Sequence, residues 1–296
     1  MTDDQQHSRP RAPVRCLIVN ADDFGRNDAV NEGVAEAFRR GIVTSTSLVA
    51  TGPAFDAAVK LAGELPGLGV GIHLAATEYI PALPPAEIPR LVDAEGRFYP
   101  RRRQFQRIAL NPRMRGELLR EWDAQIRKVL SAGIRLTHID GHGHCHAHPA
   151  AAGIVLELAQ RYGVGNVRLP AEPLFWKPGW SLSWRFPAKV ALNAASRITR
   201  LTWQGKLKFP SPFFGFSHGG QISTEVIRQV ASSVPAGVSE LMVHVATSSE
   251  QLPGYRTKFD FTRDFRGVTS FTKVQFEREF GVSLVNYSGP GISNAR

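Results

Sequence analysis

Five of the nine histidines in the chain stand within eleven residues of one segment. The segment reads His-Ile-Asp-Gly-His-Gly-His-Cys-His-Ala-His and runs from His138 to His148. Neutral imidazole is the commonest side-chain ligand for transition metals, and so many histidines at this spacing would be unusual in a purely structural role. The run therefore predicts metal binding. Because side chains alternate along a strand, His138, Asp140 and His142 are expected on one face of it.

Other polar groups also lie in or directly after short apolar runs. They are an aspartate pair and two separate histidines: Asp22, Asp23, His73 and His244. Taken singly, each has a structural explanation, since an aspartate pair before a helix is a common N-cap and a lone histidine is often a hydrogen-bonded core residue. All four residues lie in or directly after an apolar run, and this shared position favours a common site.

The adjacent aspartates Asp22 and Asp23 present a geometric difficulty for such a site. Neighbouring residues of a strand point to opposite faces, so both carboxylates can reach one centre only where the strand breaks. Gly25 follows two residues later and would permit a turn of this kind. We therefore expect the first strand to end in a break close to these residues.

Apolar runs alternate with segments of helical spacing along most of the chain. The runs predict strands at 15–21, 44–51, 70–75, 136–140, 166–169, 240–245 and 282–287. The helical segments are 27–40, 53–64, 113–131, 149–162, 224–233 and 271–280. This α/β alternation without a Gly-rich nucleotide motif favours a distorted (β/α) barrel of about seven parallel strands. The carboxyl ends of barrel strands converge on one face, so the polar groups should meet there.

The predicted organisation is a disordered tail at 1–14 and a single domain at 15–290. Insertions are expected at about 77–112, read as a long loop rich in Pro and Arg, and at 173–222. The tail lacks the apolar core of a secretion signal, and no stretch reaches the roughly 20 apolar residues of a membrane span. Only two cysteines occur, which fits a reducing compartment. We expect a cytoplasmic protein.

The net charge of +10 raises nucleic acid as a partner, but the distribution of the charge argues against it. Residues 173–224 contain no Asp or Glu, seven basic residues and four of the five tryptophans. Aromatic rings among cations are typical of a peripheral contact with an anionic membrane, here on its inner face. The predicted membrane or substrate contacts are Trp176, Trp180 and Trp184. The alternative is a lid whose aromatic residues pack on the barrel.

Five motifs together resemble the YdjC-like carbohydrate deacetylases, relatives of the NodB-type polysaccharide deacetylases. They run in family order: NADDFG at 20–25, GIVTSTSLV at 41–49, GIHL at 71–74, THIDGHGHCH at 137–146 and ELMVH at 240–244. The resemblance implies a distorted (β/α) barrel with one divalent metal ion. It also implies a hydrolase of linear amides that removes acetyl groups from N-acetylated sugars.

A further motif, FGVSLVNY at 280–287, resembles the branch of this family that is associated with hopanoid biosynthesis. That resemblance implies a glycolipid substrate, an N-acetylglucosaminyl group on bacteriohopanetetrol, which would be converted to the glucosaminyl product. The basic and aromatic insertion fits such a substrate independently, because a soluble disaccharide needs no apolar surface of this kind.

Matched position by position, the resemblance implies Asp23, His73 and His142 as metal ligands, Asp22 as general base and His244 as general acid. One carboxylate and two imidazoles leave coordination positions open for water and for a carbonyl oxygen. The metal would lower the pKa of that water and polarise the carbonyl, while the base takes a proton and the acid protonates the departing amine. Zn²⁺ suits this ligand set, and Mg²⁺ and Mn²⁺ are the alternative ions for the site.

Three more residues are expected to support the site. Asp140 and His138 would support the ligand His142 from behind, and Arg168 would pair with Asp22 and keep it ionised. The alternative for Arg168 is a surface salt bridge. The histidines after His142 have no assigned role, since they could be solvated, cap the next helix or touch substrate.

Alternative functions also follow from these residues. A deacetylase of soluble chito-oligosaccharides needs the same metal site without the lipid contact. Another metal-dependent hydrolase, such as a phosphoesterase, would use two ions and could recruit His144, His146 and His148. A nucleic-acid-binding protein would use the positive charge, but the sequence has no recognised binding motif and we expect no such partner. The sequence gives no indication of the oligomeric state.

Overall fold

The computed structural model describes residues 14–174, 185–248, 259–289 and 292. Nearly all of the predicted tail therefore lies outside the described residues. The predicted membrane contacts Trp176, Trp180 and Trp184 lie outside them as well.

Within the described residues, seven strands form one sheet in which every pairing is parallel. The strands are β1 (Arg15–Phe24), β2 (Ser45–Leu48), β3 (Gly69–Leu74), β4 (Ile139–Gly141), β5 (Phe213–Phe214), β6 (Gly237–Val243) and β7 (Ser283–Leu284). Their order is β4-β3-β2-β1-β6-β5, with β7 beside β1. The sheet curves into a half-barrel, which confirms the predicted distorted α/β barrel.

β1 is central because three strands pair with it at different positions along its length. β7 pairs with Cys16 and Leu17 near its start, and β2 pairs with it from Asn20 to Phe24. β6 pairs along most of the strand on the other side. The carboxyl end of β1 is therefore enclosed between two neighbours, and that end carries the aspartate pair.

The sheet is open between β4 and β5, and one irregular segment crosses the opening. The strand predicted at 166–169 is not formed there, and that prediction was wrong in detail. Instead, Val167 and Asn166 make isolated parallel bridges to Ile139 and Lys208. The chain thus lies where a barrel strand would lie, but it is too short to form a ladder of its own.

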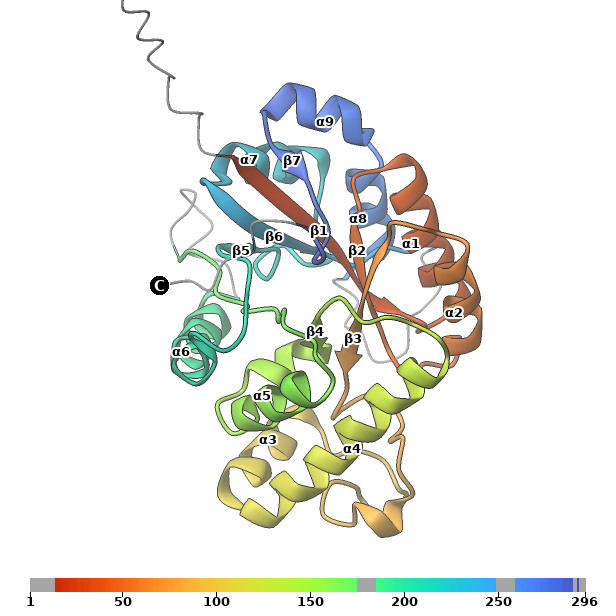
Figure 1. Ribbon diagram of the computed structural model, residues 1–296, viewed down its shortest axis with the longest axis vertical. Helices are drawn as coiled ribbons and strands as arrows, with labels where there is room; N and C mark the ends of the chain where they lie inside the picture. The colour runs from red at the N-terminus through yellow and green to blue at the C-terminus, as the bar shows by residue number, and fades with distance from the viewer. Residues whose placement is uncertain (1–13, 175–184, 249–258, 290–291, 293–296) are drawn as a thin grey trace, which may run out of the picture.

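Six helices match the predicted positions: α1 (Asp28–Arg40), α2 (Phe55–Gly63), α4 (Pro112–Ser131), α5 (Ala152–Arg161), α7 (Thr224–Ser233) and α9 (Lys273–Phe280). Helix α6 (Phe186–Trp203) lies within the insertion expected at 173–222, and no helix was predicted at α8 (Phe261–Val268). The described residues also form two 3₁₀ turns, Pro85–Glu87 and His142–Ala147. Figure 1 shows α4 and α5 beside β3 and β4, with α1 and α2 beside β1 and β2. None of the helices among the described residues is both long and apolar enough to cross a membrane.

The segment 77–112 is not only a loop, because it contains the helix α3 (Arg101–Leu110). Its arginine-rich first turn follows Pro100, and Phe105 and Ile108 are its buried apolar residues. Two apolar positions three residues apart make a weak periodic signal, which the many prolines and arginines obscured. The helix packs against α4 and carries Arg101 to the site described below.

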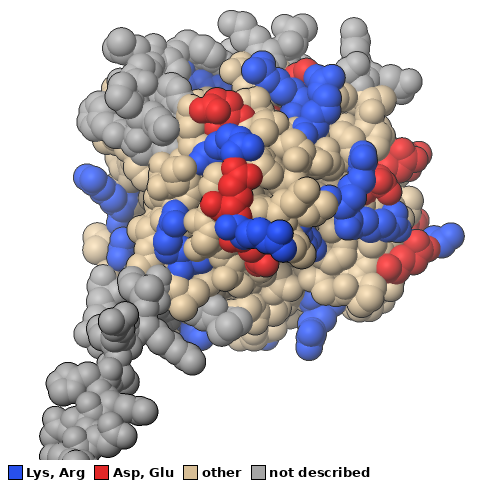
Figure 2. Space-filling view, turned by 90° about the horizontal axis from the view of Figure 1, so that it is seen from above, with Lys and Arg blue, Asp and Glu red and all other residues tan. Residues whose placement is uncertain are grey.

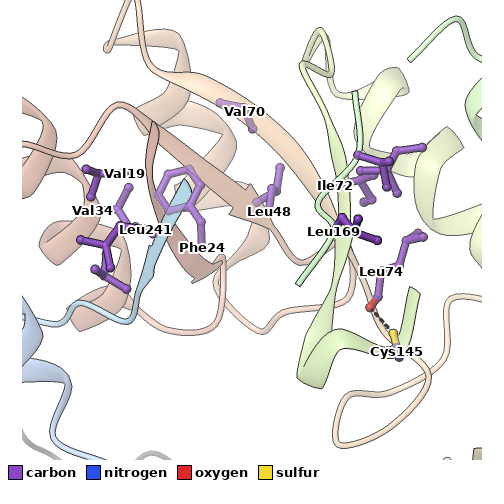
Figure 3. Close-up of a cluster of buried hydrophobic side chains, with 14 of the residues drawn as sticks. Val19, Phe24, Val34, Leu48, Val70, Ile72, Leu74, Cys145, Leu169 and Leu241 are labelled. Atoms are coloured by element: carbon purple, nitrogen blue, oxygen red, sulfur yellow. Dashed lines mark hydrogen bonds between the residues drawn. The ribbon is translucent and has the colours of Figure 1, made fainter. Parts of the chain in front are cut away.

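The core beneath the strand ends is continuous and apolar. Val19, Phe24 and Leu48 from neighbouring strands pack together with Leu241 (Figure 3). At the other side of the same cluster, the Cys145 thiol donates a hydrogen bond to the Leu74 carbonyl over 3.1 Å. This bond ties the histidine-rich segment to the end of β3, so the two segments approach the site together.

Charged side chains on the face seen in Figure 2 are mixed in sign. Lys and Arg lie among Asp and Glu there, and no continuous basic surface covers that face. The positive net charge is therefore not gathered on this face in the way that a nucleic-acid-binding surface requires.

Candidate metal centre

The carboxyl ends of β1, β3, β4 and β6 meet at one cavity of about 340 Å³. Asp22, His73, His142 and His244 line it, so the structure brings together polar groups that are far apart in sequence. Asp23 lies directly behind this surface and is fully buried. The convergence expected from parallel strand ends is thus present.

The break in β1 occurs at Asp23 itself. Its φ of 69° lies in the left-handed region, and the register with β2 shifts between Ala21 and Phe24. This irregularity lets both aspartates face the site, as the sequence required. Gly25 also has a positive φ, and its amide donates to the Asn31 side chain over 2.7 Å, which holds the turn in place.

Asp23 Oδ1 is the point on which the predicted ligands converge. It lies 3.0 Å from His142 Nδ1 and 3.5 Å from His73 Nε2. Burial opposes the charge of Asp23, but His142, Arg26 and His73 together hold its pKa well below its usual range. Burial also disfavours charge on His142, yet Asp23 and Glu78 raise its pKa to about 9. The group combines one buried carboxylate with two buried imidazoles.

His73 is oriented from behind by Asp140. Its Nδ1 lies 2.7 Å from Asp140 Oδ1, which turns Nε2 toward Asp23. Ser47 donates to Asp140 Oδ2 over 2.6 Å and fixes the carboxylate in turn. Burial lowers the pKa of His73, but Asp140, Asp22 and Asp23 more than offset it and raise that pKa. Asp140 was expected to support His142, but the histidine that it orients is His73.

Arg168 is fully buried and forms the predicted pair with Asp22. Its two terminal nitrogens donate to the two carboxylate oxygens over 2.8 and 2.7 Å. The same guanidinium lies 2.8 Å from Asp140 and 2.8 Å from Glu240, so it is not a surface salt bridge. One cation therefore holds three carboxylates beneath the cavity.

His138 does not lie beside His142. Its ring stacks on Tyr287 with centroids 3.8 Å apart, and Nε2 lies 3.2 Å from Ser47 Oγ. Burial lowers the pKa of His138 to about 3, so it is neutral. The expectation that the two histidines share one strand face was wrong, because β4 ends at Gly141 and His142 begins a 3₁₀ turn. Among the described residues, the His138 ring reaches the site through Ser47, which also contacts Asp140.

The three later histidines have three different environments. His144 has a φ of 61°, lines the cavity, and packs against Phe213 and Phe216. His146 is fully buried, and its Nε2 donates to the Arg168 carbonyl over 3.0 Å. His148 Nδ1 accepts a hydrogen bond from the amide two residues later, at the start of the next helical segment. The run is not a five-histidine cluster.

His244 stands directly after β6 and lines the cavity with Asp22. Its backbone amide donates to Asp264 Oδ2 over 3.0 Å, and its ring lies against Phe259 and Phe261. Burial lowers the pKa of its imidazole, so the ring is neutral near pH 7. Asp264 also accepts two other backbone amides and so fixes the position of this strand end.

Glu78 and Tyr79 are among the residues at the site that were missed from the sequence. Glu78 Oε2 lies 3.0 Å from His142 Nε2, and the Tyr79 hydroxyl donates to Asp23 Oδ1 over 3.0 Å. Both follow β3 in the segment that was read as a loop. Their position just beyond His73, a predicted ligand at the end of the same strand, could have indicated that they belong to the site.

The buried group of Asp23, His73 and His142 fits a divalent metal ion. Each residue offers one ligand atom, and these atoms all lie within 4.8 Å of one another. One carboxylate oxygen and two imidazole nitrogens are ligands that Zn²⁺ and related ions take. Asp22, His73 and Asp140 also lie close enough, but both of those aspartates are already bound by Arg168. The first group is therefore the better metal site.

Known proteins have similar sequences, and one solved structure at 30% identity has a similar fold. The YdjC-like protein family matches residues 16–282. A carbohydrate deacetylase of Brevibacillus brevis is 37% identical over 276 residues, which cover 93% of this chain and 99% of the relative. A carbohydrate deacetylase of Thermoanaerobacter pseudethanolicus is 28% identical over 278 residues, with 93% and 99% covered. The crystal structure of a candidate cellobiose-phosphate cleavage protein from Enterococcus faecalis has a TM-score of 0.73 at 30% identity, covering 94% of this chain and 99% of that one.

The family match extends from β1 to β6 rather than over one motif. The matched region begins within β1 and ends just before β7. It contains every residue of the buried metal-binding group and of the Arg168 network. The agreement of motifs, fold and full-length similarity shows that the chain belongs to the YdjC-like family.

Proposed function

We propose that the protein is a metal-dependent N-deacetylase that hydrolyses the acetamide group of an N-acetylated sugar. The observation that carries this proposal is the meeting of Asp22, His244 and the buried group of Asp23, His73 and His142 at one cavity. Amide hydrolysis needs an electrophilic ion, a base for water and an acid for the amine, and these groups supply all three. The relatives that are named carbohydrate deacetylases support the same reaction.

In this proposal Asp23, His73 and His142 hold the divalent ion. When bound, the ion supplies Lewis acidity to the amide carbonyl and acidity to the attacking water. Asp22 accepts the proton of that water, and Arg168 keeps its carboxylate at the edge of the cavity. His244 protonates the departing amine nitrogen. Burial lowers the pKa of its imidazole, which makes the protonated ring a stronger acid toward the amine.

The role of Asp22 is tested by the change Asp22→Asn. Loss of the base should lower kcat for acetate release by at least about 100-fold, the usual contribution of a general base. The variant should still bind about one metal ion per chain, because Asp22 is not in the better ligand group. Acetate release and metal content are measured together, and full turnover by the variant would show that another group is the base.

Metal stoichiometry separates this proposal from a two-ion hydrolase such as a phosphoesterase. Treatment with a chelator should abolish acetate release, and Zn²⁺ or Mg²⁺ should restore it. Saturation near one ion per chain supports the deacetylase, whereas activity that appears only at two ions per chain supports the alternative. The same titration identifies which ion the site prefers.

We further propose that the sugar is carried by a lipid, such as an N-acetylglucosaminyl hopanoid, and that the protein contacts a membrane surface. Helix α6 begins at the cavity, where Arg185 and Ala188 are lining residues. Along its exposed side it presents Ile198 and Leu201, which are 55% and 76% exposed. An apolar stripe that leads to the cavity suits a substrate with an apolar tail. This support concerns only part of the insertion, since Trp203 is buried in the core.

Flotation with anionic vesicles tests the membrane contact. The double change Ile198→Gln and Leu201→Gln should reduce flotation, while Leu110→Gln should not, because Leu110 is equally apolar and 85% exposed on a different helix. Equal flotation of all variants would contradict a membrane contact through α6. Acetate release from N-acetylglucosaminyl lipid and from soluble chitobiose then separates the two substrate classes, and activity on chitobiose alone would favour the soluble alternative.

A further inference from the structure

Both histidines of the metal-binding group have the same arrangement of partners. Each turns one ring nitrogen toward Asp23 Oδ1, at 3.5 Å for His73 and 3.0 Å for His142. The opposite nitrogen of each ring meets a second carboxylate, which is Asp140 at 2.7 Å and Glu78 at 3.0 Å. A carboxylate behind a histidine selects its tautomer and orients its ring, and such partners strongly affect metal affinity. Glu78 thus occupies for one ligand the place that Asp140 occupies for the other.

The two carboxylates differ in how they are held. Asp140 is fully buried and bound by Arg168 and Ser47. Glu78 has a side chain that is 40% exposed, and it lines the cavity. Its backbone has a φ of 65°, a left-handed conformation that is unfavourable for a residue with a side chain. No hydrogen bond of the fold needs the Glu78 carboxylate apart from the one with His142 among the described residues.

The neighbouring residue strengthens the connection with the metal site. Tyr79 donates its hydroxyl to Asp23, and its ring meets the His142 ring edge-on with centroids 5.1 Å apart. Two consecutive residues therefore contact two members of the predicted ligand group. The turn is held by the Tyr79 amide, which donates to the Thr77 carbonyl over 2.7 Å. A strained backbone that places side chains on a functional group is a common feature of active sites.

We propose that Glu78 is a positioning residue that holds His142 with Nδ1 toward the metal and thereby sets the affinity of the protein for its ion. The inference rests on the proposed metal dependence and adds a residue to that site. With Nε2–H donating to Glu78, the lone pair of Nδ1 is free to face the same point as Asp23 Oδ1. Without Glu78, the His142 ring can rotate or change tautomer, and the ligand set is no longer preorganised.

Metal affinity of the stripped protein tests this assignment. Zn²⁺ is titrated in competition with a chelating indicator, and Glu78→Ala should weaken binding by about 10- to 100-fold. Glu78→Gln should weaken it less, because the amide oxygen can still accept the hydrogen bond from His142. Glu95→Ala is the matched control, since Glu95 is exposed in the same insertion and should leave affinity unchanged. In the Zn²⁺-bound protein, the ¹⁵N shifts of His142 should report a protonated Nε2.

A fourth variant separates positioning from a general structural role. Glu78→Gly relieves the left-handed strain while it removes the carboxylate, so the metal-free protein should melt at the same temperature as wild type or higher, yet bind Zn²⁺ more weakly. Parallel loss of melting temperature and affinity in both Gly and Ala variants would overturn the proposal. Wild-type affinity in the Ala and Gly variants would overturn it as well. Failure of the wild-type protein to bind any divalent ion would instead contradict the proposed function.

Discussion

At the scale of single residues, Asp23 carries the most demanding geometry of the site. One of its carboxylate oxygens faces two imidazoles and the Tyr79 hydroxyl, while its backbone adopts a left-handed conformation. Such a conformation costs about 1–3 kcal/mol in a residue other than glycine, so it persists only where the surroundings enforce it. This conformation lets two adjacent carboxylates face one site, with Asp22 toward the cavity and Asp23 toward the histidines.

His244 lies beside the cavity and is not in the metal-binding group, so its role can be separated from metal binding. The change His244→Gln should lower kcat by about 100- to 10,000-fold if the imidazole protonates the leaving amine. The affinity for Zn²⁺ should stay within about twofold of wild type. Steady-state kinetics and a metal titration check the two parts, and a variant that loses the metal would identify His244 as a ligand instead.

At the scale of elements, the close approach of β3 and β4 depends on a position without a side chain. A Cβ on Gly71 would lie 2.3 Å from the His138 ring, which packs directly over β3. The ring cannot move aside easily, because it is stacked on Tyr287 and is held between Ser47 and Thr137. Gly71 therefore lets β3 and β4 approach each other, and these two strands lead to His73 and His142.

The change Gly71→Ala should destabilise the protein by about 1–3 kcal/mol, the usual cost of overpacking a core. Gly63→Ala is the matched control, because a Cβ there has nothing within 4 Å and Ala favours the helix over Gly. Urea unfolding of both variants measures the difference. If Gly71→Ala were as stable as Gly63→Ala, the His138 ring would not be a rigid part of this contact.

At the scale of the whole molecule, buried acidic side chains outnumber the buried cation that they contact beneath the cavity. Arg168 is fully buried and faces Asp22, Asp140 and Glu240, so one positive charge meets three carboxyl groups. Burial raises the pKa of Glu240 to about 7, although Arg168 opposes that rise. Glu240 therefore keeps its proton in the folded protein at a pH where the unfolded chain has lost it.

This difference predicts how stability changes with pH. Between the ordinary pKa of 4.5 and the folded value of about 7, the unfolded chain releases a proton that the native protein retains. The free energy of unfolding should therefore fall across this window by up to about 3 kcal/mol from this group. Glu240→Gln cannot lose a proton and keeps an acceptor for Arg168, so its stability relative to wild type should rise from pH 5 to pH 8.

Urea unfolding of wild type, Glu240→Gln and Glu64→Gln at both pH values checks the prediction. Glu64 is exposed, and the Glu64→Gln variant should follow the wild-type pH dependence. A pH dependence of Glu240→Gln that also matches wild type would show that Glu240 is already ionised at pH 5, with its charge compensated by Arg168.

Much of the fold and site could be predicted because it depends on local periodicity. Alternating strands and helices identified six of the seven strands and six helices at nearly their observed positions. Since parallel strand ends converge, the same pattern indicated that Asp23, His73 and His142 would meet. The resemblance to a family assigned roles to these residues, and the pair of Arg168 with Asp22 is also present.

What the sequence by itself determined is therefore the set of strand-end residues, because their spacing follows from the chain alone. The tertiary structure decided which of them share a contact. The turn after Gly141 separates His142 from His138, and the turn after β3 brings Glu78 to His142, 64 residues away in sequence. Neither the separation of His142 from His138 nor the contact of Glu78 with His142 follows from a periodic pattern in the sequence. Both depend on where irregular backbone is held by distant packing, and only the folded chain supplies those contacts.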